Sequence, residues 1–444
     1  MIGFDGAIQM AQTGGPLNAY DGTTITNNSI TVPADIDTLT SGVDKDPSDN
    51  VGILLGFGQN QSISNNTIQL AGNGVSNTAN FAQSVGIETQ TGLPGSYDGL
   101  QIKANTITVQ NAQNAKPEIV IGVWENGHAD SSNITISGNS FTNLSSSNNP
   151  AANLERGFRL TSHSSATTTV TYQDNTVSGA NIGFQWLNTS DFGTGDFSSG
   201  EPIRLIGNNV QNAITGVLVQ SKGAAYLNGN TFTSSLTTFD ATGLSVIDGG
   251  RLAPSASTAA VENNLFSLKP TGSSTKVYTG ISIGSDAGSI GSINNNNLAG
   301  NSSGKALVNA LGTQVDAQSN WWGSTSSTVV AAQHTGLVDD GNFVTINPPV
   351  ISSFTFPTLT VGTAITPITV TASGSPTPTL SASGLPNGLI FTDNGNGTGT
   401  ISGTPVAGEG GGAHGLATGN PVVIDAAIGF PQRHTPDRCF LQYQ

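Results

Sequence analysis

The side chains best suited to chemistry recur at one position of a short repeated segment. The segment reads Gly, apolar, any residue and usually apolar again, and its third residue is Glu88, Trp124, Arg159 and Gln185 in four consecutive copies. If the apolar residues of each copy point inward on a strand, the third residue points to solvent. When such strands lie side by side, these four residues form an outward stripe with about 4.8 Å between neighbours.

This stripe is suited to carbohydrate binding. An exposed indole such as Trp124 can stack on a sugar ring, while Glu88, Arg159 and Gln185 can hydrogen-bond to hydroxyl groups. We therefore predict a ligand-binding set of Trp124, Gln185, Glu88 and Arg159. The alternative is a purely structural, solvent-facing ladder in which Glu88 and Arg159 only balance each other's charge.

The same region also offers residues for catalysis. Glu88, Arg159, Glu125 and His163 are the catalytic candidates, because carboxylates cleave glycosides and a basic residue beside an acid can abstract a proton. His128 and Glu155 also fall within a few residues of the stripe. A hydrolase or lyase acting on a polysaccharide is therefore the alternative to binding without turnover.

An acidic segment at 44–50 is the candidate metal site. Asp44, Asp46 and Asp49 could ligate calcium through their carboxylates, although the glycine and bidentate glutamate of an EF-hand loop are absent. The interpretation that we favour is a solvated loop whose Pro and Asp residues simply turn the chain. The histidines do not have a zinc-binding spacing and no phosphate-binding glycine loop occurs, so we expect no required cofactor, with calcium as the one possible ion.

A second sequence repeat predicts the scaffold that holds these residues in place. It reads apolar, two residues, Asn, one residue, apolar, and it returns at spacings of 22 to 39 residues. Its central asparagines are Asn28, Asn66, Asn105, Asn139, Asn175, Asn208, Asn230, Asn264, Asn296 and Asn320. Asparagine suits such bends because it tolerates left-handed backbone geometry and its amide can bond nearby backbone. Each repeat thus holds two short period-two strands around a bend, which predicts a solenoid with stacked asparagines.

Bulk composition narrows the class of protein further. Charged residues make up only 9% of the 444 residues and the formal net charge is −15, which argues against a nucleic-acid partner. Cys439 is the single cysteine, so no intrachain disulfide can form. No apolar run reaches the length of a membrane span. Residues 1–12 lack the features of a signal peptide, so we expect the chain to be a fragment of a longer, exported one.

The asparagine repeat resembles that of right-handed parallel β-helix proteins of bacterial surfaces, which share the pectate-lyase-like architecture and its internal asparagine ladder. The resemblance covers roughly residues 20–325 and implies an all-β solenoid of about ten coils. The segment at 319–324, SNWWGS, is similar to the segment that closes many such helices. Trp321 and Trp322 are therefore predicted to cap the end of the solenoid, and His334 after them is predicted to lie on the surface.

A proline-punctuated linker at 347–357 predicts a second domain. The segments GLPNGL at 384–389 and GTISGTP at 399–405 resemble an immunoglobulin-like repeat of bacterial surface proteins, and 393–397 predicts a hairpin turn. After residue 407 the alternation stops, which suggests a reading-frame change or cloning junction and a disordered tail. The expected domains are a β-helix at 1–346, an incomplete immunoglobulin-like sandwich at 347–407 and an atypical tail at 408–444.

These patterns favour one function over two others. The leading expectation is an extracellular or cell-surface protein that binds a carbohydrate or another surface polymer without turnover. The first alternative is a secreted hydrolase or lyase, and the second is a passive structural stalk. The enzymes that the β-helix resemblance implies carry clustered Asp residues with Arg, Lys or His on one face, whereas this chain offers Glu88, Arg159 and scattered acids.

Overall fold

The computed structural model describes most of the chain. Described are residues 6–10, 20–32, 50–71, 83–89, 97–110, 118–126, 132–144, 153–161, 169–187, 202–255, 259–269, 275–299, 301, 304–344, 347–352, 359–375, 378–383, 385–406, 422–428 and 437–441. The chain divides into two compact units, Met1–Phe343 and Val344–Gln444. The site candidates all fall in the first unit.

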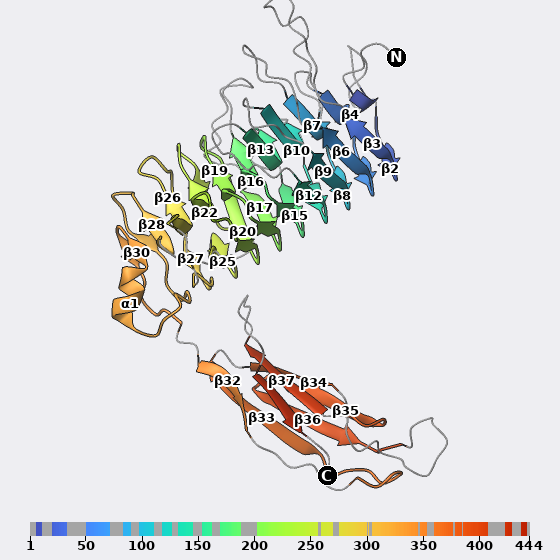
Figure 1. Cartoon of the computed structure of the whole chain (residues 1–444), viewed down its shortest axis with the longest axis vertical. Helices are drawn as coiled ribbons and strands as arrows, with labels where there is room; N and C mark the ends of the chain where they lie inside the picture. Colours follow the sequence, from blue (N-terminus) through green and yellow to red (C-terminus); the bar gives the residue numbers. More distant parts are fainter. Residues whose placement is uncertain are drawn as a thin grey trace, which may run out of the picture. The chain divides into compact units, whose positions relative to one another are not determined.

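The first unit is a right-handed parallel β-helix in which successive coils add one strand to each of three sheets (Figure 1). Sheet A contains β1 (Gly6–Gln9), β4 (Asn50–Leu55), β7 (Gln83–Thr89), β10 (Glu118–Asn126), β13 (Asn153–Thr161), β16 (Ile182–Leu187), β19 (Thr215–Val219), β22 (Ala241–Val246), β26 (Tyr278–Ile283), β28 (Leu307–Asn309) and β30 (His334–Thr335). The predicted all-β solenoid is thus confirmed.

The other two sheets flank the asparagine bend. Sheet B contains β2 (Thr24–Thr26), β5 (Ser62–Ser64), β8 (Gln101–Lys103), β11 (Ile134–Ser137), β14 (Val170–Gln173), β17 (Ile203–Ile206), β20 (Ala224–Asn228), β23 (Arg251–Leu252), β24 (Val261–Glu262) and β27 (Ile293–Asn294). Sheet C contains β3 (Ser29–Val32), β6 (Thr67–Ala71), β9 (Thr106–Gln110), β12 (Ser140–Asn143), β15 (Thr176–Ser178), β18 (Asn209–Gln211), β21 (Thr231–Thr233) and β25 (Leu265–Ser267).

The asparagines form a continuous hydrogen-bonded ladder between sheets B and C. In each step, the side-chain amide and the backbone N–H of one asparagine both donate to the Oδ1 of the next, as Asn66 does to Asn105 at 2.9 and 3.0 Å. The ladder runs without a break from Asn28 to Asn320. The predicted stacking inside consecutive bends is confirmed.

One detail of the bend differs from the expectation. The left-handed residue is the one before each ladder asparagine, for example Asn65 at φ 56° and Ala104 at φ 55°. The ladder asparagine itself follows this turn and turns its amide into the solenoid, where Asn66 is almost completely buried. The repeat therefore needs a residue that tolerates the left-handed region at one position and an amide at the next.

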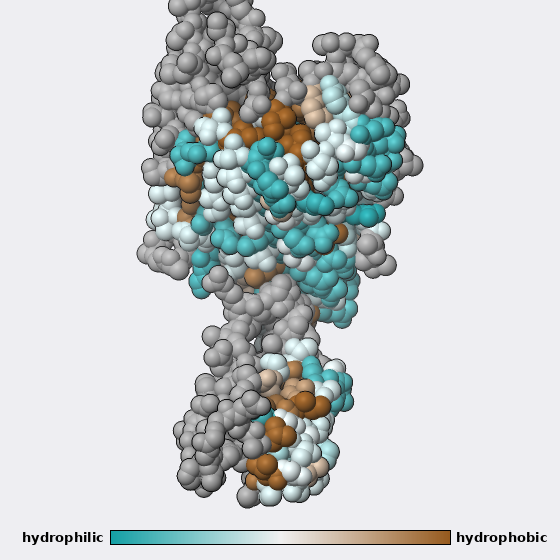
Figure 2. All heavy atoms as spheres, turned by 90° about the vertical axis from the view of Figure 1, so that its right-hand side faces the viewer, coloured by the Kyte–Doolittle hydropathy of each residue, from teal (hydrophilic) through white to brown (hydrophobic). Residues whose placement is uncertain are grey.

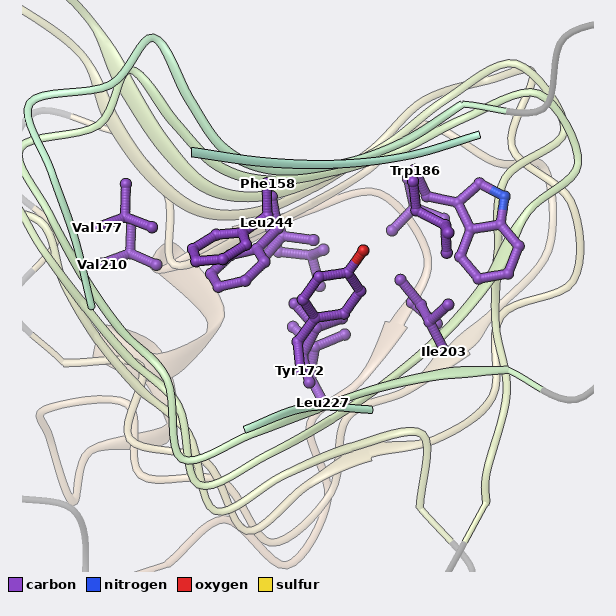
Figure 3. Packing of buried hydrophobic residues seen from close by; sticks show 14 of the residues in the cluster. Phe158, Tyr172, Val177, Trp186, Ile203, Val210, Leu227 and Leu244 are labelled. Atoms are coloured by element: carbon purple, nitrogen blue, oxygen red, sulfur yellow. The ribbon is translucent and has the colours of Figure 1, made fainter. Parts of the chain in front are cut away.

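The strands fill the interior with apolar residues, and strands such as β4, β6 and β16 each contribute two. Phe158 stacks on Phe184 at 4.9 Å between ring centroids, and the Tyr172 ring packs edge-on against both. Figure 3 shows the Phe158 ring pointing toward Val177 from sheet C, with the Tyr172 ring beside it. Such stacking buries most of each side chain and aligns the coils in register, so the outer residues of neighbouring strands also stand in columns.

The glycines of sheet A are close-packing positions between coils. A Cβ on Gly122 would lie 2.5 Å from the Gly157 carbonyl oxygen and 2.5 Å from a ring carbon of Phe141 in sheet C. The Gly122 position therefore faces the core, and so does the following Val123, which is fully buried. Because two successive residues face inward, strict alternation breaks at this glycine, and the residue before it returns to the outer face.

The last coils close the apolar end of the solenoid. Here β29 (Val315–Asp316) pairs with β31 (Val338–Asp339), and the helix α1 (Ser327–Ala332) inserts Val330 into the core. Trp322 is buried in that same core, as a cap requires, whereas Trp321 is only half-buried. His334 is less exposed than a surface histidine would be: its ring lies 5.5 Å from the Trp322 ring, its side chain is 13% exposed, and Asp340 is 3.1 Å away.

The second unit consists of antiparallel sheets. One contains β32 (Asn347–Ile351), β33 (Ile368–Ser375), β36 (Thr398–Gly403) and β35 (Leu389–Asp393), and the other contains β34 (Pro378–Ser383), β37 (Val422–Ile428) and β38 (Asp437–Leu441). The hairpin predicted at 393–397 joins β35 to β36. Beyond residue 407, where no strand was expected, β37 pairs with β34 in antiparallel register.

Candidate functional site

The predicted stripe exists on the outer face of sheet A. Trp124 pairs in register with Glu88 of β7 and with Arg159 of β13, and Arg159 pairs in turn with Gln185 of β16. The column continues on either side with Leu54 and Leu218. Parallel pairing therefore brings together four residues that are far apart in sequence.

Trp124 lies outside the solenoid core. Its neighbour Val123 belongs to the interior cluster, whereas Trp124 is half-buried and packs with Leu54 against a separate cluster of Val51, Val85 and Ile121. The guanidinium carbon of Arg159 stands 4.6 Å from the centroid of the indole, which is a cation–π contact. This contact orients both side chains along the stripe.

Gln185 differs from the expectation in its exposure. It belongs to the outward column, but only 5% of its surface is exposed, so it does not face open solvent. Its side-chain oxygen is buried and has no hydrogen-bond partner in the described part of the chain. A buried amide oxygen without a partner is unfavourable by about 1–3 kcal/mol.

Arg156 is a member of this site that the repeat pattern did not indicate. It precedes Gly157, and the break in alternation there places it on the outer face three residues before Arg159. Burial, and secondly the nearby charge of Arg159, lower the pKa of Arg156 to about 10. The guanidinium stays protonated at neutral pH. The signal that could have found Arg156 is a charged residue at a position that holds Val51, Val85 and Ile121 in earlier coils.

Among the described residues, the structure does not bring the remaining catalytic and metal candidates together into a site. The backbone of Glu125 pairs with Leu160, while His163, His128 and the metal candidates Asp44, Asp46 and Asp49 lie outside the described residues. Glu155 is fully buried on the strand beside Arg156. Within the described ranges, no group of three or more His, Cys, Asp or Glu side chains could hold a metal ion. The catalytic roles and the calcium site remain predictions.

Much of the described solenoid surface is hydrophilic. Hydrophilic and intermediate residues cover most of the solenoid face visible in Figure 2, with apolar residues in a smaller area. The outward residues of sheet C illustrate this, since Thr106, Thr108, Ser140 and Thr142 stand in register with no charged residue between them. Against this background, two arginines and an indole within two neighbouring coils are a concentrated feature.

Comparisons with known proteins identify no relative. No family model, no curated protein and no solved structure matches the chain. No helix in the described ranges is long and apolar enough to cross a membrane.

Proposed function

We propose that this protein binds a linear carbohydrate along the outer face of sheet A and does not turn it over. The observation that carries the proposal is the half-buried Trp124, in register between Glu88 and Arg159 on a row of parallel strands. A sugar ring and a coil have similar lengths, about 5 Å against about 4.8 Å. One sugar can therefore lie over each coil, with Trp124 stacking on one ring.

The polar neighbours of Trp124 complete this binding surface. Glu88 is half-buried one coil before the indole and can accept hydrogen bonds from sugar hydroxyls. Gln185 stands two coils after it in the same column, but its side chain is buried. An extended row of such positions favours a polymer over a small molecule, because a single sugar would contact only one or two of them.

We also propose the setting of this activity. The low charge content and the asparagine-ladder solenoid resemble bacterial surface proteins of the pectate-lyase-like architecture, and the second unit resembles their immunoglobulin-like repeats. An extracellular or cell-surface location follows from that resemblance. A passive stalk is the structural alternative, in which Trp124 only packs on its neighbours.

The direct test removes the indole. Trp124→Ala should weaken binding of the polysaccharide by about 1–2 kcal/mol, or roughly 5- to 30-fold in Kd, because one aromatic stacking contact is lost. Calorimetric titration against a panel of soluble polysaccharides, with and without calcium, measures this change. Leu218→Ala is the matched control, since Leu218 is half-buried in the same outward column two coils away from Arg159. Equal affinities of the wild type and Trp124→Ala would support the stalk instead.

Substitution of the stripe carboxylate separates binding from catalysis. Glu88→Gln keeps the size of the side chain and its hydrogen-bonding capacity, so we expect binding to persist and no product to form with either protein. Release of new reducing ends or unsaturated sugars is the assay. If the wild type degrades a polymer and Glu88→Gln lowers that rate by about a hundredfold or more, the protein is a hydrolase or lyase and Glu88 is its acid–base residue.

A further inference from the structure

The outward face of sheet C carries two rows of hydroxyl groups. The rows are formed by the first and third residues of each strand, which parallel pairing places in register with their counterparts in the next coil. We call these two rows the hydroxyl array. Its central block is Thr106, Thr108, Ser140, Thr142, Thr176 and Ser178. Serine or threonine also fills most of the other positions, and the exceptions are Gln69, Asn209, Gln211 and Leu265.

The composition of the array exceeds what strand preference explains. Threonine is favoured on exposed strands in general. The strands of sheet B belong to the same coils, yet their outward positions include Gln101, Lys103, Gln173, Arg204 and Glu262. In the described strands of sheet C, no charged residue stands at either outward position. Short, uncharged hydroxyl side chains are therefore concentrated on one face of the solenoid.

The asparagine ladder fixes the spacing of the array. The first residue of each sheet C strand directly follows a ladder asparagine, as Thr106 follows Asn105 and Ser140 follows Asn139. The side-chain hydrogen bonds between successive ladder asparagines are all between 2.9 and 3.1 Å long. Neighbouring strands are about 4.8 Å apart, and alternate residues along one strand are about 6.6 Å apart. The hydroxyl groups therefore stand on a regular two-dimensional lattice.

The side chains of the array are ordered before any ligand binds. Threonine is branched at Cβ, which restricts χ1 and holds its methyl and hydroxyl groups in fixed directions. Thr106 is exposed, and Ser140 and Thr176 are half-buried. Within the described part of the chain, the hydroxyl groups of these three residues make no hydrogen bond to another residue. Each can therefore donate to water and accept from it.

We propose that the hydroxyl array of sheet C binds the surface of ice. Ice is a lattice of water oxygens, and the repeats of its prism face are close to the strand spacing and the alternate-residue spacing of the array. Hydroxyl groups at those spacings can take the places of lattice waters, and threonine methyl groups fit the gaps between them. The array shares no residue with the sheet A site, so the inference is independent of the proposed carbohydrate binding.

The chemistry of the array favours ice over other ligands. A small molecule would contact only a few of the repeated positions, whereas a crystal face matches the repeat over many coils. A charged side chain would hold a hydration shell that does not fit the ice lattice, and the described array contains none. A crystalline polysaccharide is also periodic, but the array offers it no aromatic ring on which a sugar could stack.

The direct test measures ice binding of the full chain. A dilute solution is frozen slowly onto a seeded ice surface, and the fraction of protein incorporated into the ice is determined. The thermal hysteresis, which is the gap between the melting and freezing temperatures, is measured on the same protein. We expect incorporation into ice and a measurable hysteresis. Exclusion of the wild type from ice, with melting and freezing at one temperature, would overturn the proposal.

Substitution within the array assigns the effect to sheet C. Thr142→Lys and Thr106→Lys each place a charge and a longer side chain in the lattice, so both should lose most of the ice incorporation and hysteresis. Thr135→Lys is the matched control, because Thr135 is half-buried on the outward face of sheet B in the same coil as Thr142. Melting followed by circular dichroism checks that every variant is folded. Equal ice binding of folded Thr142→Lys and Thr135→Lys would contradict the assignment.

Two further measurements separate this inference from the proposed function. Trp124→Ala should keep the full ice incorporation of the wild type, because Trp124 lies on sheet A. Loss of ice binding in Trp124→Ala would place the ice-binding surface on sheet A and refute the role of sheet C. Microcrystalline cellulose is the second probe. If cellulose retains the wild type but not Thr142→Lys, and ice excludes both, the array binds a polymer surface and the inference fails.

Discussion

At the scale of single residues, the site combines groups that stabilise the fold with groups that oppose it. The Trp124 ring packs on outward aliphatic side chains and on Arg159. Gln185 does the reverse, because its buried amide oxygen has no hydrogen-bond partner among the described residues. Residues that lower stability at one surface position are typical of binding sites, where the ligand supplies the missing interaction.

The lowered pKa of Arg156 predicts a pH dependence of stability with a defined sign. Its folded-state pKa of about 10 lies below the ordinary value of 12.5, so between these values the unfolded chain binds more protons. The contribution of Arg156 to the free energy of unfolding therefore rises with pH across that window, and its unfavourable effect is complete below pH 10. The stability advantage of Arg156→Ile over the wild type should be largest near pH 8 and smaller at pH 11.

Denaturant unfolding of both proteins at these two pH values measures this difference. Comparison of the two proteins cancels the titration of lysines and tyrosines, which they share. An advantage that grows with pH would contradict the assignment, since it would mean that the buried guanidinium stabilises the fold.

At the scale of elements, the asparagine ladder fixes the coil register that creates the stripe. Asn139 accepts from both nitrogens of Asn105 and donates to Asn175 and to the carbonyl of Ile102, all within the buried bend. Removal of this side chain leaves several buried polar groups without partners. Each such group is unfavourable by about 1–3 kcal/mol. In the ladder, the buried asparagine of each coil therefore depends on the asparagine of the neighbouring coil for its hydrogen bonds.

Asn139→Ala should destabilise the solenoid by roughly 2–4 kcal/mol, because it interrupts the middle of this ladder. Asn28→Ala is the matched control at the half-exposed first step, where Asn28 donates to Asn66 and its backbone N–H keeps the same acceptor. We expect the control to lose about 1 kcal/mol or less. Chemical denaturation followed by circular dichroism gives both values. Equal effects of the two substitutions would show that the ladder does not act as a buried network.

The repeat allowed the elements to be predicted, and the limits of that prediction have a physical cause. The ladder asparagines and the outward column of Trp124 follow from regular spacing, since a solenoid copies one geometry in every coil. Arg156 was missed because Gly157 and Phe158 both face inward, which breaks the period-two alternation assumed for a strand. The burial of Gln185 depends on three-dimensional packing, which spacing along one strand does not encode.

In the second unit, too, local features could be predicted from the sequence and long-range strand pairing could not. The hairpin at 393–397 was predictable because its Asn-Gly pairs determine a local turn. The strand β37 was not predictable, since it lacks a local signal and pairs with β34 far away in the sequence, from Ser383 with Val423 to Pro378 with Ile428. Local chemistry therefore predicted the turns and repeats, whereas long-range pairing had to come from the structure.

At the scale of the whole molecule, the tryptophans are placed so that one of them reports on the site. Trp186 and Trp322 are buried in the solenoid core, and Trp321 bridges to Asn297 in the capping coils. Trp124 alone among the four lies on the outer face beside the arginine pair. A glycan lying along sheet A therefore meets a single indole, and emission changes can be assigned to it.

The measurement that tests the central claim most directly is a tryptophan fluorescence titration of the wild type and Trp124→Phe with the polysaccharide that binds in calorimetry. Phenylalanine keeps an aromatic face for stacking, so Trp124→Phe should still bind, with its affinity checked by calorimetry. We predict a saturable emission change in the wild type and none in Trp124→Phe at ligand concentrations that saturate it. An equal emission change in both proteins would place the ligand elsewhere and contradict a binding site on the outer face of sheet A.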